Sequence, residues 1–151
     1  MAQVSIGSIS TGTLRTEDLL EEFAAELNTL DRESKPRRWS ALIGEALDYI
    51  AMDDWTDDQM EQARYIQEEL FDALNEYCPP FVYFGSHPGD GADYGFWPDV
   101  DALEEEMRYT GEDTADADTK YLPDSNVLVQ VSDHGNILVM DMDRRELWSC
   151  V

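Results

Sequence analysis

The hydrophobic pattern of the chain changes at Pro79 and Pro80, and this change limits the possible folds more than any other feature. Before these prolines, apolar residues recur every three or four positions, which is the spacing of amphipathic helices. After them, apolar residues occur in short runs and alternating patterns, as in strands. Proline ends a helix because it lacks a backbone N–H and restricts the preceding residue. The sequence therefore predicts a single α+β domain over residues 1–151.

Three amphipathic helices are predicted before the prolines. The first begins at Thr16 and continues to about residue 30. The second follows the connector 31–38, where Ser34 is predicted to cap a helix whose first turn holds Pro36. The third runs from about Thr56 to Tyr77 and stops at the proline pair.

The C-terminal part predicts a small antiparallel sheet. Apolar residues alternate over 127–131 and return over 137–142 and 146–151, and polar turns separate these stretches. These stretches predict a C-terminal three-stranded meander. Residues 81–84 are aromatic and apolar, and they are predicted to add a further strand.

The segments between the predicted strands have different characters. Residues 85–95 contain four glycines and are predicted to form a loop, and residues 98–109 a short acidic helix. Residues 110–125 are polar and acidic without periodicity, so they are predicted to be a flexible acidic loop. Near the N-terminus, Val4, Ile6 and Ile9 predict a short strand.

The charge of the chain excludes several kinds of binding. It has 34 acidic and 10 basic residues, a formal net charge of −24, so it is not expected to bind nucleic acid or an anionic membrane directly. No run of 18 apolar residues is present to span a bilayer, and residues 1–12 do not resemble a secretory signal. We therefore expect a cytoplasmic protein, with Cys78 and Cys150 as free thiols.

The negative charge is concentrated in the middle of the chain. Residues 53–118 contain 20 acidic and two basic residues, a net charge of −18. In the predicted third helix, seven acids fall within an arc of roughly 120° when each residue turns the helix by about 100°. This acidic stripe consists of Asp57, Asp58, Glu61, Glu68, Glu69, Asp72 and Glu76. Tyr65 lies on the same side, and Glu104, Glu105 and Glu106 form a second acidic patch.

Three interpretations of this acidity remain open. A solvated surface, or adaptation to high salt, accounts for the charge without a partner. A DNA mimic accounts for its local concentration, because DNA carries one charge per ~1.7 Å of axis and a basic nucleic-acid-binding protein would dock on a similar row of carboxylates. An acidic immunity-type inhibitor of a basic toxin is the third. The second and third are non-enzymatic roles that need no cofactor. The DNA mimic would bind its partner through the stripe, with Glu104, Glu105 and Glu106 as a second patch.

An enzymatic alternative places a metal in the glycine-rich segment. Histidine and carboxylate side chains bind divalent metals, and His87, Asp90 and Asp93 lie close together in the sequence. His134, the second histidine, also lies in a turn beside an aspartate. These four residues would form the metal site of a hydrolase. The competing interpretation is structural, with the glycines forming tight turns and the nearby aromatic residues filling the core.

Three stretches resemble small proteins encoded by bacteriophages and related mobile elements. They are the glycine-rich segment 79–98, the opening 10–19, and the turn 133–136 with strands on both sides. The function of those proteins is unassigned, so no catalytic residue is carried over. The resemblance implies a phage-like origin, a bacterial cytoplasm, and a host nucleic-acid-binding or defence protein as partner. A dimer would lengthen the stripe, but the sequence leaves the oligomeric state open.

Overall fold

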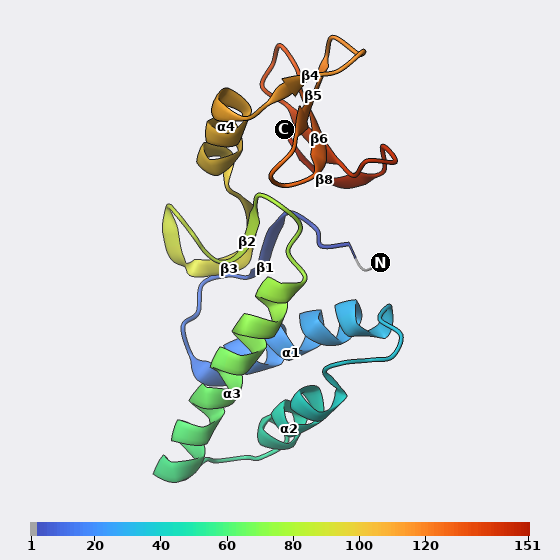
Figure 1. Ribbon diagram of the computed structural model, residues 1–151. Coiled ribbons are helices and arrows are strands. Elements are labelled where there is room, and N and C mark those ends of the chain that lie inside the picture. Colours follow the sequence, from blue (N-terminus) through green and yellow to red (C-terminus); the bar gives the residue numbers. More distant parts are fainter. Residues whose placement is uncertain (1–2) are drawn as a thin grey trace.

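The computed structural model describes residues 3–151 and has an α+β architecture, as the hydrophobic pattern predicts (Figure 1). In Figure 1, the N-terminal helices lie at one end of the molecule, the C-terminal sheet and a short helix lie at the other, and a smaller sheet lies between them. The helices are α1 (Thr16–Arg32), α2 (Ser40–Ile50), α3 (Asp57–Glu76) and α4 (Val100–Tyr109). The strands are β1 (Gly7–Ser10), β2 (Val82–His87), β3 (Asp90–Pro98), β4 (Glu112–Asp113), β5 (Thr119–Leu122), β6 (Val127–Val131), β7 (Ile137–Met140) and β8 (Glu146–Cys150).

The first three helices occupy the predicted parts of the chain, with one correction. The prediction that Ser34 caps the second helix is wrong, because α2 begins only at Ser40. The buried carboxylate of Asp31 accepts hydrogen bonds from the backbone N–H groups of Arg38 and Trp39 and holds the connector outside the helix. The predicted third helix is confirmed as α3.

The predicted loop 85–95 is instead part of a hairpin. Strands β2 and β3 pair antiparallel, with Phe84 opposite Phe96, and β1 pairs with the other side of β3. A Cβ at Gly95 would collide with the backbone of Gly7 and Ser8, so only glycine allows β1 to approach this closely. Gly95 therefore serves close strand pairing, which hydrophobic periodicity does not reveal.

The C-terminal sheet has five strands in the order β4-β5-β6-β7-β8, where the sequence predicts a three-stranded meander with residues 81–84 as a further strand. The meander β6-β7-β8 is confirmed, but residues 81–84 belong to the other sheet. Strands β4 and β5 lie within 110–125, where the sequence predicts a loop. Their polar residues are held by side-chain contacts, including Thr114 to Thr119 and Lys120 to Asp113. A fourth helix, α4, follows β3 close to its predicted position.

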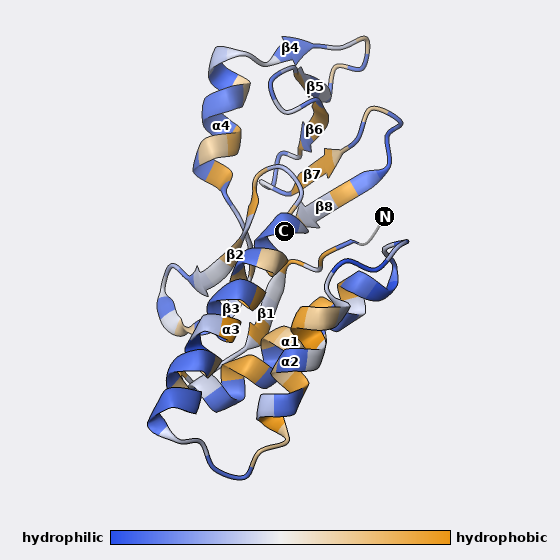
Figure 2. Ribbon diagram, turned by 60° about the horizontal axis from the view of Figure 1, so that its bottom comes forward, coloured by the Kyte–Doolittle hydropathy of each residue, from blue (hydrophilic) through white to orange (hydrophobic). Residues whose placement is uncertain are grey.

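One continuous hydrophobic core joins both ends of the molecule. It includes Phe23 of α1, Leu70 of α3, Phe84 of β2 and Trp148 of β8, all no more than 2% exposed. The indole N–H of Trp148 donates to the carbonyl of Pro80 at 2.8 Å, which ties the C-terminal sheet to the start of β2. Figure 2 shows apolar and hydrophilic bands along the same helices, with the apolar bands contributing to this core.

Candidate interaction surface

The acidic stripe lies on the exposed side of α3. All seven of its residues are exposed, whereas Ala63, Ile66, Leu70 and Leu74 on the other side of the helix are at most 1% exposed. Tyr65 is 55% exposed. At ~1.5 Å per residue, the stripe from Asp57 to Asp72 extends over ~22 Å. The buried side fixes the helix to the core, so these carboxylates are presented on a rigid support.

The N-terminal end of α3 is stabilised by a capping box and by acidic residues in its first turn. Thr56 and Gln59 form a reciprocal capping box, in which the backbone N–H of Gln59 donates to Thr56 Oγ1 at 3.2 Å and that of Thr56 donates to Gln59 Oε1 at 2.9 Å. Asp57 and Asp58 occupy the first turn, where the positive end of the helix dipole favours carboxylates.

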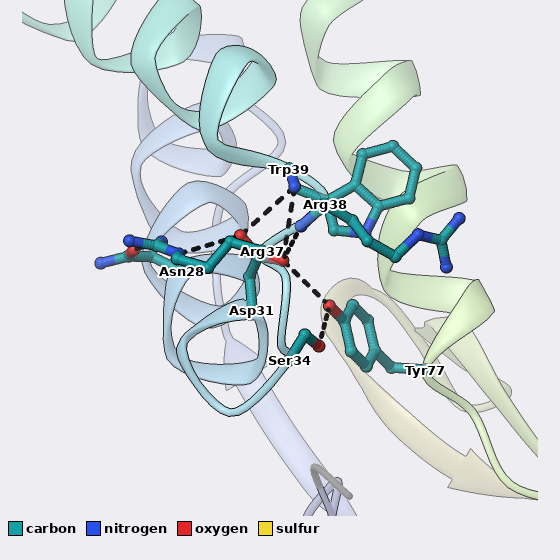
Figure 3. Close-up of polar contacts among 7 residues, drawn as sticks. All are labelled: Asn28, Asp31, Ser34, Arg37, Arg38, Trp39 and Tyr77. Atoms are coloured by element: carbon teal, nitrogen blue, oxygen red, sulfur yellow. Dashed lines mark hydrogen bonds and ion pairs between the residues drawn. The ribbon is translucent and has the colours of Figure 1, made fainter.

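The C-terminal end of α3 is held by a buried carboxylate from α1 (Figure 3). Asp31 is fully buried, and Oδ1 accepts from the Arg38 N–H at 2.8 Å and the Tyr77 hydroxyl at 3.3 Å. The Arg37 Nε donates to Oδ2 at 3.2 Å, and the Trp39 N–H reaches both oxygens at 3.3 Å. Desolvation by burial raises the pKa of Asp31, but the hydrogen bonds from Arg38, Trp39 and Arg37 and the charge of Arg37 together lower it below its ordinary value.

This arrangement places an arginine against the end of the stripe. The Arg38 guanidinium lies 2.9 Å from Glu76, and both side chains are about half exposed. Such a surface pair adds at most about 1 kcal/mol of stability, but it neutralises Glu76. Within residues 3–151, the other six acids of the stripe make no ion pair within 4.0 Å, and neither does Arg64 on the same helix. The unpaired part of the stripe therefore runs from Asp57 to Asp72.

The second predicted patch divides into two parts. Glu104 and Glu105 are exposed on α4. The carboxylate of Glu106 instead accepts hydrogen bonds from the backbone N–H of Ser125 at 3.0 Å and its hydroxyl at 2.7 Å. Glu106 therefore anchors α4 to the turn between β5 and β6. Sequence reasoning missed this role because Ser125 is 19 residues away and carries no distinctive motif.

The four residues of the metal alternative lie in two different hairpins. His87 and Asp90 face each other across the β2–β3 turn, and Asp93 lies further along β3. His87 Nδ1 accepts from the Gly89 N–H at 2.9 Å, and its ring packs edge-on against Trp97. His134 lies in the turn between β6 and β7, in the other sheet. In the described part of the chain, no three His, Cys, Asp or Glu side chains are arranged to hold a metal ion.

No helix within residues 3–151 is long and apolar enough to cross a membrane. Comparison of the chain with protein-family models, curated proteins and solved structures gives no match.

Proposed function

We propose that the protein is a non-enzymatic acidic binding protein, in which α3 presents a DNA-like row of carboxylates to a basic nucleic-acid-binding partner. The observation that carries this proposal is the unpaired, exposed stripe from Asp57 to Asp72 on a helix with a buried opposite side. Like charges at i, i+4, such as Glu68 and Asp72, disfavour a helix by a few tenths of a kcal/mol per pair. The helix retains these repulsive pairs without interleaved lysines. This favours a role that needs the electric field of the carboxylates.

The stripe combines concentrated negative charge with a rigid helical support, and a DNA-binding partner would need both. A partner that neutralises phosphates does so with lysine and arginine side chains, and its affinity falls steeply as salt increases. A fixed row of carboxylates reproduces the charge that such side chains meet on DNA. Tyr65, exposed within the stripe, offers an apolar contact between the charged groups. The proposed partner is a host protein that binds nucleic acid or takes part in defence.

The test compares two triple charge reversals. The first changes Glu61, Glu68 and Asp72 to lysine and leaves Glu76, which Arg38 already neutralises. The second changes Glu21, Glu45 and Asp48, which are exposed on α1 and α2, and so alters the net charge equally. Partner proteins are captured from host lysate at low and high salt, and the captured complex is then challenged with duplex DNA.

The expected result is salt-sensitive capture that the α3 variant loses and the α1–α2 variant retains, with DNA displacing the partner. Equal loss in both variants would show that only the total charge matters. A complex that resists displacement by DNA would instead favour the immunity-type inhibitor. If the α3 variant still captured the partner, the proposed surface would be wrong.

A further inference from the structure

Helix α2 has an exposed side that differs from those of its neighbours α1 and α3. The exposed side of α3 carries the acidic stripe, and Glu21 and Glu22 are exposed on α1. On α2, four small or apolar residues fall within an arc of roughly 60° when each residue turns the helix by about 100°. This α2 ridge consists of Ser40, Gly44, Leu47 and the C-terminal cap residue Ala51. In a chain of net charge −24, the ridge of this one helix is therefore uncharged.

The α2 ridge has a projecting side chain next to an open position. Leu47 is 53% exposed, although leucine side chains are usually buried. Gly44 lies on the same side of the helix one turn earlier, and a Cβ added to it would meet no atom within 4 Å. The glycine backbone can therefore be approached closely by a side chain of another molecule, and the leucine can supply such a side chain. Residues 3–151 leave both positions uncovered.

The residues of the α2 ridge are spaced symmetrically along the helix. The intervals between them are four, three and four residues, so the ridge reads the same in both directions. When two copies of α2 pack antiparallel about a two-fold axis, Leu47 of each copy lies opposite Gly44 of the other. Ser40 and Ala51, which are both small, lie opposite each other at the ends. A projecting residue thus meets an open one twice, which is the self-complementarity that a symmetric dimer requires.

The charges at the two ends of α2 follow the same symmetry. Three basic residues precede the helix and two acids follow it, namely Lys35, Arg37 and Arg38, and Asp53 and Asp54. Arg38 lies as many residues before the midpoint of the ridge as Asp53 lies after it, so the antiparallel register brings them together between copies. Within residues 3–151, Asp53 forms no ion pair, and Arg38 is 60% exposed with one carboxylate, that of Glu76, beside it. A second copy therefore matches the charge at both ends of α2, whereas a uniformly basic partner would be repelled at one of them.

We propose that the chain forms a symmetric dimer through antiparallel packing of the α2 ridges of two copies. Leu47 of each copy packs against Gly44 of the other, and Arg38 of each copy pairs with Asp53 of the other. At ~1.5 Å per residue the ridge is only ~17 Å long, so the interface is small and the dimer is weak and reversible. The inference does not depend on the acidic stripe or its partner, because dimerisation is measured on the purified chain alone.

The experiment measures the mass of the purified full chain by sedimentation equilibrium from about 10 μM to about 1 mM. The salt concentration is held at about 0.15 M, where the Debye length of about 8 Å screens the charges of the two copies that lie far apart. The first variant is Leu47→Glu, and its matched control is Leu14→Glu, which adds the same charge at a leucine 64% exposed outside α2. A second pair, Arg38→Glu and Asp53→Arg, is measured separately and as an equimolar mixture. All four side chains are exposed, so the variants are expected to fold, which circular dichroism checks.

The expected result is a reversible dimer whose fraction rises with concentration. Leu47→Glu should weaken it at least about tenfold, because a carboxylate would then face the Gly44 backbone, while Leu14→Glu leaves it unchanged within about twofold. Arg38→Glu and Asp53→Arg should each weaken it at least about threefold, since like charges then meet at both ends of the interface. Mixing these two variants should restore the dimer, because both ends then join opposite charges.

A chain that stays monomeric at every concentration would overturn the proposal. Equal weakening by Leu47→Glu and Leu14→Glu would do the same, because association would then depend on total charge. A mixture of the Arg38 and Asp53 variants that associates no better than either variant alone would show that the antiparallel register is wrong.

Discussion

Replacing Asp31 with asparagine should strongly destabilise the junction of the first three helices. The fully buried carboxylate accepts hydrogen bonds from the Arg37 side chain, the Tyr77 hydroxyl and the backbone N–H groups of Arg38 and Trp39. Asparagine keeps the size but turns an N–H₂ group toward donors and leaves the Arg37 charge uncompensated. Hydrogen bonds to charged groups contribute about 1.5–3 kcal/mol each, so we expect a loss of about 3 kcal/mol. For a chain of this length, this corresponds to a fall in Tm of roughly 6–12 °C.

The pH dependence of the free energy of unfolding provides a second test of the same prediction. Because the folded-state pKa of Asp31 lies below its ordinary value, ionisation stabilises the fold above the unfolded pKa of about 3.9. That contribution is lost as the pH falls through the lower, folded-state pKa. The difference in stability between the natural chain and Asp31→Asn should therefore be full at pH 7 and shrink below about pH 4.

The measurement is urea unfolding followed by tryptophan fluorescence and circular dichroism, at pH 7 and at several acidic values. Asp124→Asn, which removes an equal charge from the surface, should change the free energy of unfolding by no more than about 0.5 kcal/mol. A loss below about 1 kcal/mol for Asp31→Asn, or a difference that does not change with pH, would refute the reasoning.

Three further changes test other parts of the fold. Gly95→Ala should destabilise by about 3 kcal/mol or prevent β1 pairing, because its Cβ meets the Gly7 backbone; loss of amide protection in β1 by hydrogen exchange checks this. Trp148→Phe should cost about 1–3 kcal/mol, since the carbonyl of Pro80 loses its donor, as urea unfolding would show. Burial raises the pKa of the Cys78 thiol to about 12, partly offset by a backbone hydrogen bond from Phe84, so iodoacetamide at pH 8 should alkylate it far more slowly than in urea.

The helical part of the fold was predictable because its determinants are local. The period of α3, its Thr56–Gln59 capping box and the stop at Pro79 all act within a few residues. The exposure of the acidic stripe follows from the same periodicity. The meander of β6, β7 and β8 was also predictable, because alternating residues and short polar turns specify neighbouring strands.

The missed elements depend on partners far away in the sequence. Strand β5 has polar residues and no clear alternation, and it exists because β6 offers a paired edge and Thr119 finds Asp116 and Gln130. A hairpin of β2 and β3 stands where the sequence predicts a loop, and Gly95 allows β1 to pair with the other side of β3. Neither effect is visible in the local pattern of apolar residues.

By itself, the sequence determined the α+β class, the three N-terminal helices and the position of seven carboxylates on one side of α3, since a helix repeats every 3.6 residues wherever it lies. Only the tertiary structure decided which of those charges stay unpaired. Arg38 meets Glu76 because the buried Asp31 holds the connector beside the end of α3, and Glu106 is engaged because α4 packs near Ser125. Whether a charge is free depends on what lies within a few ångströms of it, and folding brings those neighbours from distant parts of the chain.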